Sequence, residues 1–175
     1  MSSGTATSSN NIANALIAEI KQESATARKC LERIPEDKFD WKPHEKSMTM
    51  SRLASHLGEM FQWTGPTLDH DVLDFATMDY KPFEPKSNAE LLAHFDKSVV
   101  DAIDVLNRTP DETFMQDWTM KNGDQVYFTM PKISVMRAFV INHIIHHRGQ
   151  LSVYLRLNDI PVPSIYGPSA DEGAM

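Results

Sequence analysis

The sequence predicts an all-α protein, a four-helix bundle in a single domain. Four stretches carry apolar residues three and four positions apart, the spacing of one face of an α-helix. Each stretch is flanked by prolines or by residues that favour helix starts. With 175 residues and 41% hydrophobic side chains, the chain is long and apolar enough to bury a core without disulfides or structural metals.

The first two helices are expected at residues 11–34 and 49–63. The first ends at Pro35, because proline lacks the amide proton that an inner helical position donates. Thr49 is a suitable N-cap for the second helix, since a threonine hydroxyl accepts a hydrogen bond from an amide of the first turn. Gly65-Pro66 follows its end.

The third helix opens at Ser87 and runs to about residue 106. Ser87 and Glu90 have the spacing of a capping box, in which each side chain accepts an amide proton at the helix start. The fourth helix is expected at residues 131–158, with Pro131 in its first turn.

Two connections are too long to be simple turns. Residues 64–86 form a crossover that would let the second and third helices run parallel, with a short helix from Thr67 to Phe75. Residues 116–129 are typical of a β-hairpin, because two β-prone runs flank Asn122-Gly123, a pair that tolerates a type I′ turn.

The fourth helix carries a candidate pair of metal ligands, His143 and His147. Residues four apart lie on one face of a helix with Cβ atoms about 5–6 Å apart, close enough for two imidazoles to share an ion. Hydrogen-bonded core histidines remain the alternative. The pair belongs to an apolar stripe that excludes Arg137, Arg148 and Arg156 and comprises Met136, Val140, His143, His147, Leu151 and Tyr154.

A third ligand is expected from the second helix, where His56 shares a stripe with Leu53, Leu57 and Met60. An inward-facing histidine on a second helix is what a metal site in a bundle core requires. Near these ligands, Glu59 and Gln150 are candidates for orienting them or for moving protons, and a solvent-facing carboxylate is the alternative for Glu59.

The other histidines are weaker candidates. His146 is expected to flank the site, because it lies about 100° around the helix from His147. His44 and His70 lie among charged residues and are expected in solvent, while His94 lies near the edge of the third helix's apolar face.

Composition restricts the setting and the partners. A single cysteine, Cys30, excludes an internal disulfide framework and favours a reducing compartment. Neither a signal peptide nor an apolar run of about 20 residues is present, so we expect a cytoplasmic protein that does not enter a membrane. The net charge of −7 argues against nucleic acid as a partner.

The expected domain organisation is a flexible N-terminus at residues 1–10, the bundle at 11–160, and a C-terminal extension at 161–175 that packs on the bundle. Three prolines stiffen the extension, which would lie near the metal site, across a dimer partner, or over one end of the core. Large apolar residues in the connections suggest a partner surface or caps on the bundle ends: Trp63, Phe75, Phe83, Trp118, Tyr127 and Phe128.

Four features of the sequence occur together: His56, the segment Ile34-Pro-Glu-Asp-Lys-Phe-Asp-Trp41-Lys-Pro, the segment His143-Ile-Ile-His146-His147-Arg-Gly-Gln150-Leu, and the tail from Pro163 to Glu172. With these features the chain resembles the DinB family from about residue 12 to 172. The resemblance implies a four-helix bundle with an up-down-down-up path, commonly a homodimer, that holds one divalent ion on His56, His143 and His147.

The family's better understood branch resembles thiol-dependent S-transferases, which activate a low-molecular-weight thiol at the metal. Nickel or zinc is the favoured ion, with iron and manganese also compatible with imidazole. Three neutral imidazoles leave an ion at least one open position, which could hold a thiolate or an activated water, so the expected activity is that of a small-molecule S-transferase or of a metal-dependent hydrolase. A metal-binding or stress-response module without turnover, and a purely structural bundle, are the remaining alternatives.

Overall fold

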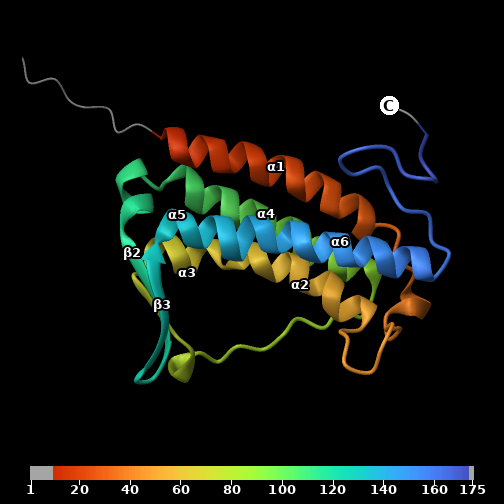
Figure 1. Cartoon of the computed structure of the whole chain (residues 1–175), viewed down its shortest axis with the longest axis horizontal. Helices are drawn as coiled ribbons and strands as arrows, with labels where there is room; N and C mark the ends of the chain where they lie inside the picture. The colour runs from red at the N-terminus through yellow and green to blue at the C-terminus, as the bar shows by residue number, and fades with distance from the viewer. Residues whose placement is uncertain (1–9, 174–175) are drawn as a thin grey trace, which may run out of the picture.

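The protein is mostly helical, with one small sheet. The computed structural model describes residues 10–173, in which four long helices lie side by side: α1 (Asn11–Leu31), α2 (Met50–Gln62), α4 (Asn88–Asn107) and α6 (Asn142–Leu157) (Figure 1). Helices α1 and α2 each pack against both α4 and α6. The sheet lies at one end of the helices and the C-terminal segment at the other (Figure 1).

The helices enclose one continuous apolar core. Every long helix contributes fully buried aliphatic or aromatic side chains to it, among them Ile20, Leu57, Leu91, Phe95, Leu151 and Leu155. The single cysteine, Cys30, is buried in the same core and is a free thiol. The core therefore includes apolar residues of all four predicted helices.

The predicted helix starts at Thr49 and Ser87 are confirmed, whereas Pro131 is the last residue of a strand and lies just before the helix that begins at Lys132. The Thr49 hydroxyl accepts a hydrogen bond from the Arg52 amide at 3.2 Å, and the Ser87 hydroxyl accepts one from the Glu90 amide at 3.2 Å. The Glu90 carboxylate accepts from the amide of Lys86, one residue before the position expected for a capping box. Helix α1 ends at Leu31, before the expected Ile34.

The crossover differs from its prediction. Instead of one helix from Thr67 to Phe75, it contains α3 (Thr64–Asp69), the strand β1 (Val72–Asp74) and the 3₁₀-helix η2 (Phe75–Thr77). Strand β1 pairs in parallel with β2 (Asp117–Asn122). A strand of three residues is too short to show alternation, and its stability depends on a partner far along the chain, so the sequence pattern did not reveal it.

The predicted hairpin is confirmed, but its turn is not the predicted one. Strand β2 pairs antiparallel with β3 (Gln125–Pro131), and Asn122 is opposite Gln125. The two turn residues are therefore Gly123 and Asp124 rather than Asn122 and Gly123. Gly123 has φ of 58°, whereas Asp124 does not have positive φ, so the turn is not type I′.

The fourth predicted helix is divided into three sections. A short helix α5 (Lys132–Val135) leads into a π-helical section η4 (Met136–Ile141), and α6 begins directly after it. A π-helical turn rotates the residues that follow relative to a continuous α-helix, and such turns are frequent at functional sites. In this chain the wide turn immediately precedes His143. Shorter 3₁₀-helices complete the helical elements, η1 (Glu36–Lys38) and η3 (Asp111–Met115).

Helix α6 buries a second stripe that the sequence pattern missed. Arg148, expected outside the apolar stripe, is 1% exposed and donates to the Glu23 carboxylate of α1 at 2.6 Å. Tyr166 of the C-terminal segment donates to the same carboxylate at 2.8 Å, and the Arg148 guanidinium lies 4.9 Å from the centre of its ring. Arg148 lies off the histidine stripe as predicted, but the sequence pattern did not reveal that it is buried, with Glu23 as the partner that a buried guanidinium needs.

The C-terminal segment packs on α1 and α6. Ile160, Val162 and Ile165 lie against the core, and Arg33 donates to the carbonyl oxygen of Pro161 at 2.9 Å. The expected flexible N-terminus, residues 1–10, lies almost wholly outside the described residues. Among the described residues, no helix is long and apolar enough to cross a membrane.

We predict that Arg148→Met lowers the free energy of unfolding by about 3–5 kcal/mol, because it leaves the buried Glu23 carboxylate without its cation. The matched control is Arg137→Met, since Arg137 also pairs with α1, through Glu19, but the two side chains are 48% and 31% exposed. That control should cost about 1 kcal/mol or less. Urea unfolding of both variants measures the difference, and equal losses would contradict the special role of the buried pair.

Candidate metal centre

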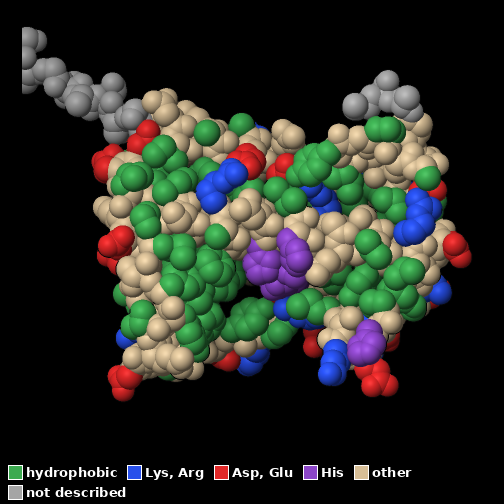
Figure 2. Space-filling view, viewed as in Figure 1, with side chains coloured by type: hydrophobic (Ala, Val, Ile, Leu, Met, Phe, Trp, Pro, Cys, Tyr) green, Lys and Arg blue, Asp and Glu red, His purple; other side chains and the backbone are tan. Residues whose placement is uncertain are grey.

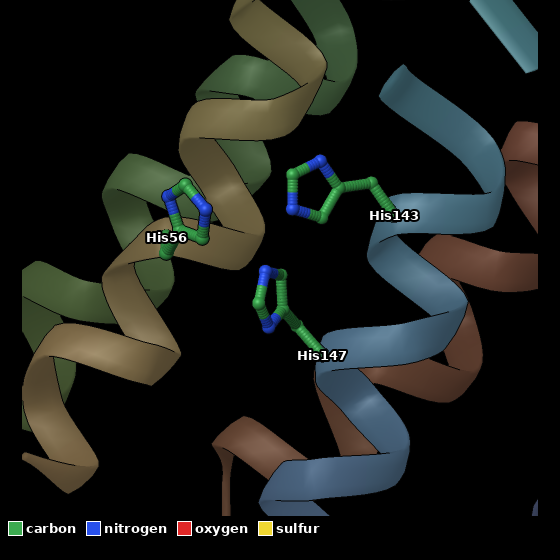
Figure 3. A group of neighbouring side chains, drawn as sticks. All are labelled: His56, His143 and His147. Atoms are coloured by element: carbon green, nitrogen blue, oxygen red, sulfur yellow. The ribbon is translucent and has the colours of Figure 1, made fainter. Parts of the chain in front are cut away.

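Three histidines from two helices converge between α2 and α6. His56 projects from α2, and His143 and His147 project from consecutive turns of α6 toward it (Figure 3). The ring centroids lie 5.4 Å apart for His56 and His143, 4.8 Å for His56 and His147, and 4.6 Å for His143 and His147. One ring nitrogen from each residue lies within 4.8 Å of the other two. The structure thus brings together the three ligands expected from the sequence.

The surroundings favour the neutral form of His143 and His147. The pKa of His147 is lowered to about 4: burial is the largest cause, the nearby His143 and His56 rings also lower the pKa, and the hydrogen bond with Gln150 opposes them. Burial, followed by the proximity of His56 and His146, also lowers the pKa of His143. Metal binding requires unprotonated imidazole, so these two rings are ready to bind a cation at neutral pH.

Two of the rings are held through Nδ1. The Nδ1 atom of His56 lies 3.0 Å from Oε2 of Glu59, and Nδ1 of His147 lies 2.7 Å from Oε1 of Gln150. When Nδ1 is engaged in this way, Nε2 is left as the free ligand atom. Metal-binding histidines usually have such a partner on the second nitrogen, which sets both the tautomer and the ring orientation.

Glu59 is the most heavily bonded side chain of the site. It is 3% exposed, which excludes the solvent-facing alternative, and its Oε2 accepts from Arg52 and from the Tyr80 hydroxyl, each at 2.8 Å. Its Oε1 accepts from the Phe83 amide at 3.0 Å. Burial alone would raise the pKa of Glu59, but the hydrogen bonds from His56, Phe83, Arg52 and Tyr80 outweigh burial and lower it to about 2. Glu59 is therefore a carboxylate at neutral pH.

The remaining histidines stay outside the cluster. His146 is exposed, with its ring centroid 4.9 Å from that of His147. His44 and His70 are exposed, as expected. His94 of α4 stacks on an aromatic ring of the crossover at 4.0 Å, and burial lowers its pKa.

A pocket of about 390 Å³ opens beside the histidines. Arg52, His56, Tyr80 and His143 line its polar end, and the rest of its wall is apolar: Met60, Trp63, Phe75, Met78, Met120 and Phe139. In the space-filling view the histidines lie at the edge of a hollow flanked by hydrophobic side chains (Figure 2). Two of the three candidate ligands are thus also part of a pocket wall.

The pocket explains part of the aromatic set that was expected to form a partner surface or to cap the bundle. Trp63 and Phe75 line the pocket, and Trp118 is fully buried in a small second core under the sheet. Phe83 stacks on His94 at 4.0 Å. The sequence pattern did not reveal the pocket, because its wall is assembled from α2, the crossover, β2, the π-helical section and the start of α6.

The C-terminal extension, by contrast, does not contribute to this wall. Its polar contacts involve Glu23 and Arg33 of the α1 side and Arg148 and Arg156 of α6, and the pocket's lining residues all precede Ile144. These contacts favour the simpler expectation, in which the extension packs over one end of the core.

Comparison with known proteins assigns the family. The model of the DinB family matches residues 6–174. The chain belongs to the DinB family. The uncharacterized protein YrdA from Bacillus subtilis (strain 168) is 47% identical over 45 residues, which is 26% of this chain and 26% of YrdA. The matched segment thus spans about a quarter of that relative's length.

Two solved structures share the fold. The DinB-like protein from Bacillus cereus ATCC 10987 aligns with a TM-score of 0.68 and 20% identity, covering 87% of this chain and 97% of that chain. The DinB-like protein YjoA from Bacillus subtilis aligns with a TM-score of 0.69 and 16% identity, with the same coverage of both chains. At this level of identity the likeness concerns the fold, so the chemistry has to be argued from the residues of this chain.

We predict that Glu59→Gln weakens divalent metal binding by roughly 10–100-fold. The neutral glutamine side chain cannot replace the carboxylate as acceptor for all its partners, which are His56, Arg52, Tyr80 and the backbone N–H of Phe83. The control is Tyr80→Phe, which removes one donor to Glu59 without touching a ligand, and should change affinity only a few-fold. Competition with a chromophoric chelator measures both. Wild-type affinity in Glu59→Gln would show that Glu59 does not orient His56.

Proposed function

We propose that the protein is a metal-dependent enzyme that acts on small molecules, with one divalent ion held by His56, His143 and His147. A single observation carries the proposal: His56 and His143 belong both to the ligand cluster and to the wall of the adjoining pocket. An ion in a closed structural site would have no need of such a pocket. A binding position that faces a small-molecule cavity is typical of catalytic metal sites.

The donor set fits a divalent transition metal. Three neutral imidazoles leave the full charge of the ion uncompensated and leave coordination positions for a further ligand. Nickel and zinc are the ions that we favour, and iron and manganese also accept imidazole. Such an ion, when bound, supplies Lewis acidity that favours the deprotonated form of a thiol or of water.

The protein's own residues then have distinct roles. Glu59 and Gln150 orient His56 and His147 through Nδ1, and the ionised Glu59 favours a proton on the His56 nitrogen that faces it. The apolar wall lowers the local polarity beside the polar end of the pocket, which strengthens electrostatic interactions there.

A thiol-dependent S-transferase is the specific activity that we favour, on the resemblance to that branch of the family. The chain has no accessible thiol of its own, since Cys30 is fully buried and burial raises the pKa of its thiol to about 11. The reacting thiol would therefore come from a small molecule. A hydrolase that activates water at the same position is the second candidate, and a metal-binding module without turnover is the third.

We predict that His143→Ala and His147→Ala each lose most of the bound metal, because two remaining imidazoles hold a divalent ion far more weakly than three. His146→Ala is the matched control, since His146 is an exposed histidine of the same helix and should retain wild-type occupancy. Elemental analysis after purification and dialysis gives the stoichiometry. Full occupancy in either ligand variant would overturn the assignment.

A second prediction separates the candidate activities. In protein loaded with cobalt or nickel, the S-transferase proposal predicts that a low-molecular-weight thiol changes the ligand-field spectrum and adds a thiolate-to-metal absorption band. The buried Cys30 cannot produce this band, and Cys30→Ala provides the control. If added thiols leave the spectrum unchanged, the result would favour the hydrolase or the metal-binding module without turnover.

We also propose that the chain forms a homodimer and that its long helices follow the up-down-down-up path of the family. The long connection between α2 and α4 supports that path. Exposed apolar residues on β3, Val126 and Tyr127, support a contact surface. Light scattering at micromolar concentration is expected to give the mass of two chains, and a monomer would contradict the dimer.

A further inference from the structure

We infer that the site accepts a molecule with a flat aromatic body and a single metal-binding head, with the body in the apolar pocket and the head at its histidine end. This inference rests on the proposed function and names the class of substrate. Its basis is the uneven distribution of polar groups around the pocket.

The polar groups that line the pocket gather at one end. The Glu59 carboxylate is hydrogen-bonded to three of the lining side chains, Arg52, His56 and Tyr80, and so holds them close together. His143 is the remaining polar residue of that end. The remaining lining side chains are hydrophobic, so the pocket separates a place for one polar group from a place for an apolar body. Hydroxyl-rich or sugar-like bodies would leave their polar groups without partners against this wall.

The apolar wall favours a flat body in particular. The Trp63 ring stacks on Phe139 with an interplanar angle of 14°, and Phe139 stacks on Phe128 with an angle of 15°. Trp63 and Phe139, two members of this run of nearly parallel rings, face the pocket, together with the flexible side chains of Met60, Met78 and Met120. Parallel rings are suited to offset stacking with an aromatic ligand, and methionines adapt to its edges.

The volume agrees with a small molecule. At about 390 Å³, the pocket lies near the lower end of the range of about 300–1,000 Å³ that small-molecule sites occupy. It therefore fits a body of one or two rings. The charge at the polar end of the pocket favours an anionic head. The Arg52 guanidinium is already neutralised by the Glu59 carboxylate, so a bound divalent ion would give this end a net positive charge.

Two hydroxamates with the same head test the inference. Acetohydroxamate and benzohydroxamate bind divalent metals through identical atoms but differ in the apolar body. Titration calorimetry on zinc-loaded protein should give benzohydroxamate on the order of 30-fold higher affinity, from the apolar area that its ring buries. Both should lose most of their affinity on metal-free protein. Equal affinities, or benzohydroxamate binding that needs no metal, would overturn the inference.

A pair of methionine variants assigns the preference to this pocket. Met78→Gln places an amide in the apolar wall at nearly constant volume, and should weaken benzohydroxamate by about 10-fold while leaving acetohydroxamate within about 2-fold. Met115→Gln is the matched control, since Met115 is 64% exposed and lies outside the pocket. If Met78→Gln kept the wild-type preference for benzohydroxamate, or if Met115→Gln lost as much benzohydroxamate affinity as Met78→Gln, the aromatic body would bind elsewhere.

The outcome is distinguishable from failure of the metal proposal. Metal content is measured on the same samples before titration, so a protein that binds no zinc contradicts the proposed function itself. A protein that binds zinc at His56, His143 and His147 but does not discriminate between the hydroxamates contradicts only the substrate class.

Discussion

Helix α6 buries polar side chains on two faces, and the rest of the molecule is arranged to give each of them a partner. On one face, His143 and His147 meet His56 of α2, with Glu59 and Gln150 on the outer ring nitrogens. On the other, the buried Arg148 meets Glu23 of α1. A polar group without a partner in such a core costs several kcal/mol. The register of α6 against both neighbours is therefore strongly constrained.

The two faces of α6 differ in their surroundings: one makes a buried structural contact and the other adjoins a pocket. The Arg148 and Glu23 pair is shielded by Tyr166, so the C-terminal segment completes a structural contact at the far side of the helix from the histidines. The histidine face opens instead on a pocket to whose wall α6 contributes His143, while the other lining residues come from segments that precede α6. Adjacent residues of one helix, His147 and Arg148, thus belong to two environments with different requirements.

Sequence reasoning recovered the parts of this arrangement that depend on local periodicity. The long helices, the Thr49 and Ser87 caps and the three inward histidines all follow from spacing along the chain. Arg148 was missed because a charged side chain lowers the apparent hydrophobicity of a stripe even when it is buried with a partner. Strand β1 and the pocket were missed because both depend on residues brought together from distant segments.

The carboxylate of Glu59 connects these distant segments to the ligand cluster. It accepts a hydrogen bond from the Tyr80 hydroxyl and another from the Phe83 amide, both in the crossover, while it holds Nδ1 of His56. A shift of the crossover away from α2 would remove two of the donors that keep this buried group ionised, and would alter the electrostatic environment of His56. The position of a pocket wall and the orientation of His56, a candidate metal ligand, are therefore linked through the Glu59 side chain. A molecule that occupies the pocket and contacts Tyr80 would act on the same carboxylate, so that substrate binding and metal binding are expected to influence each other's affinity reciprocally.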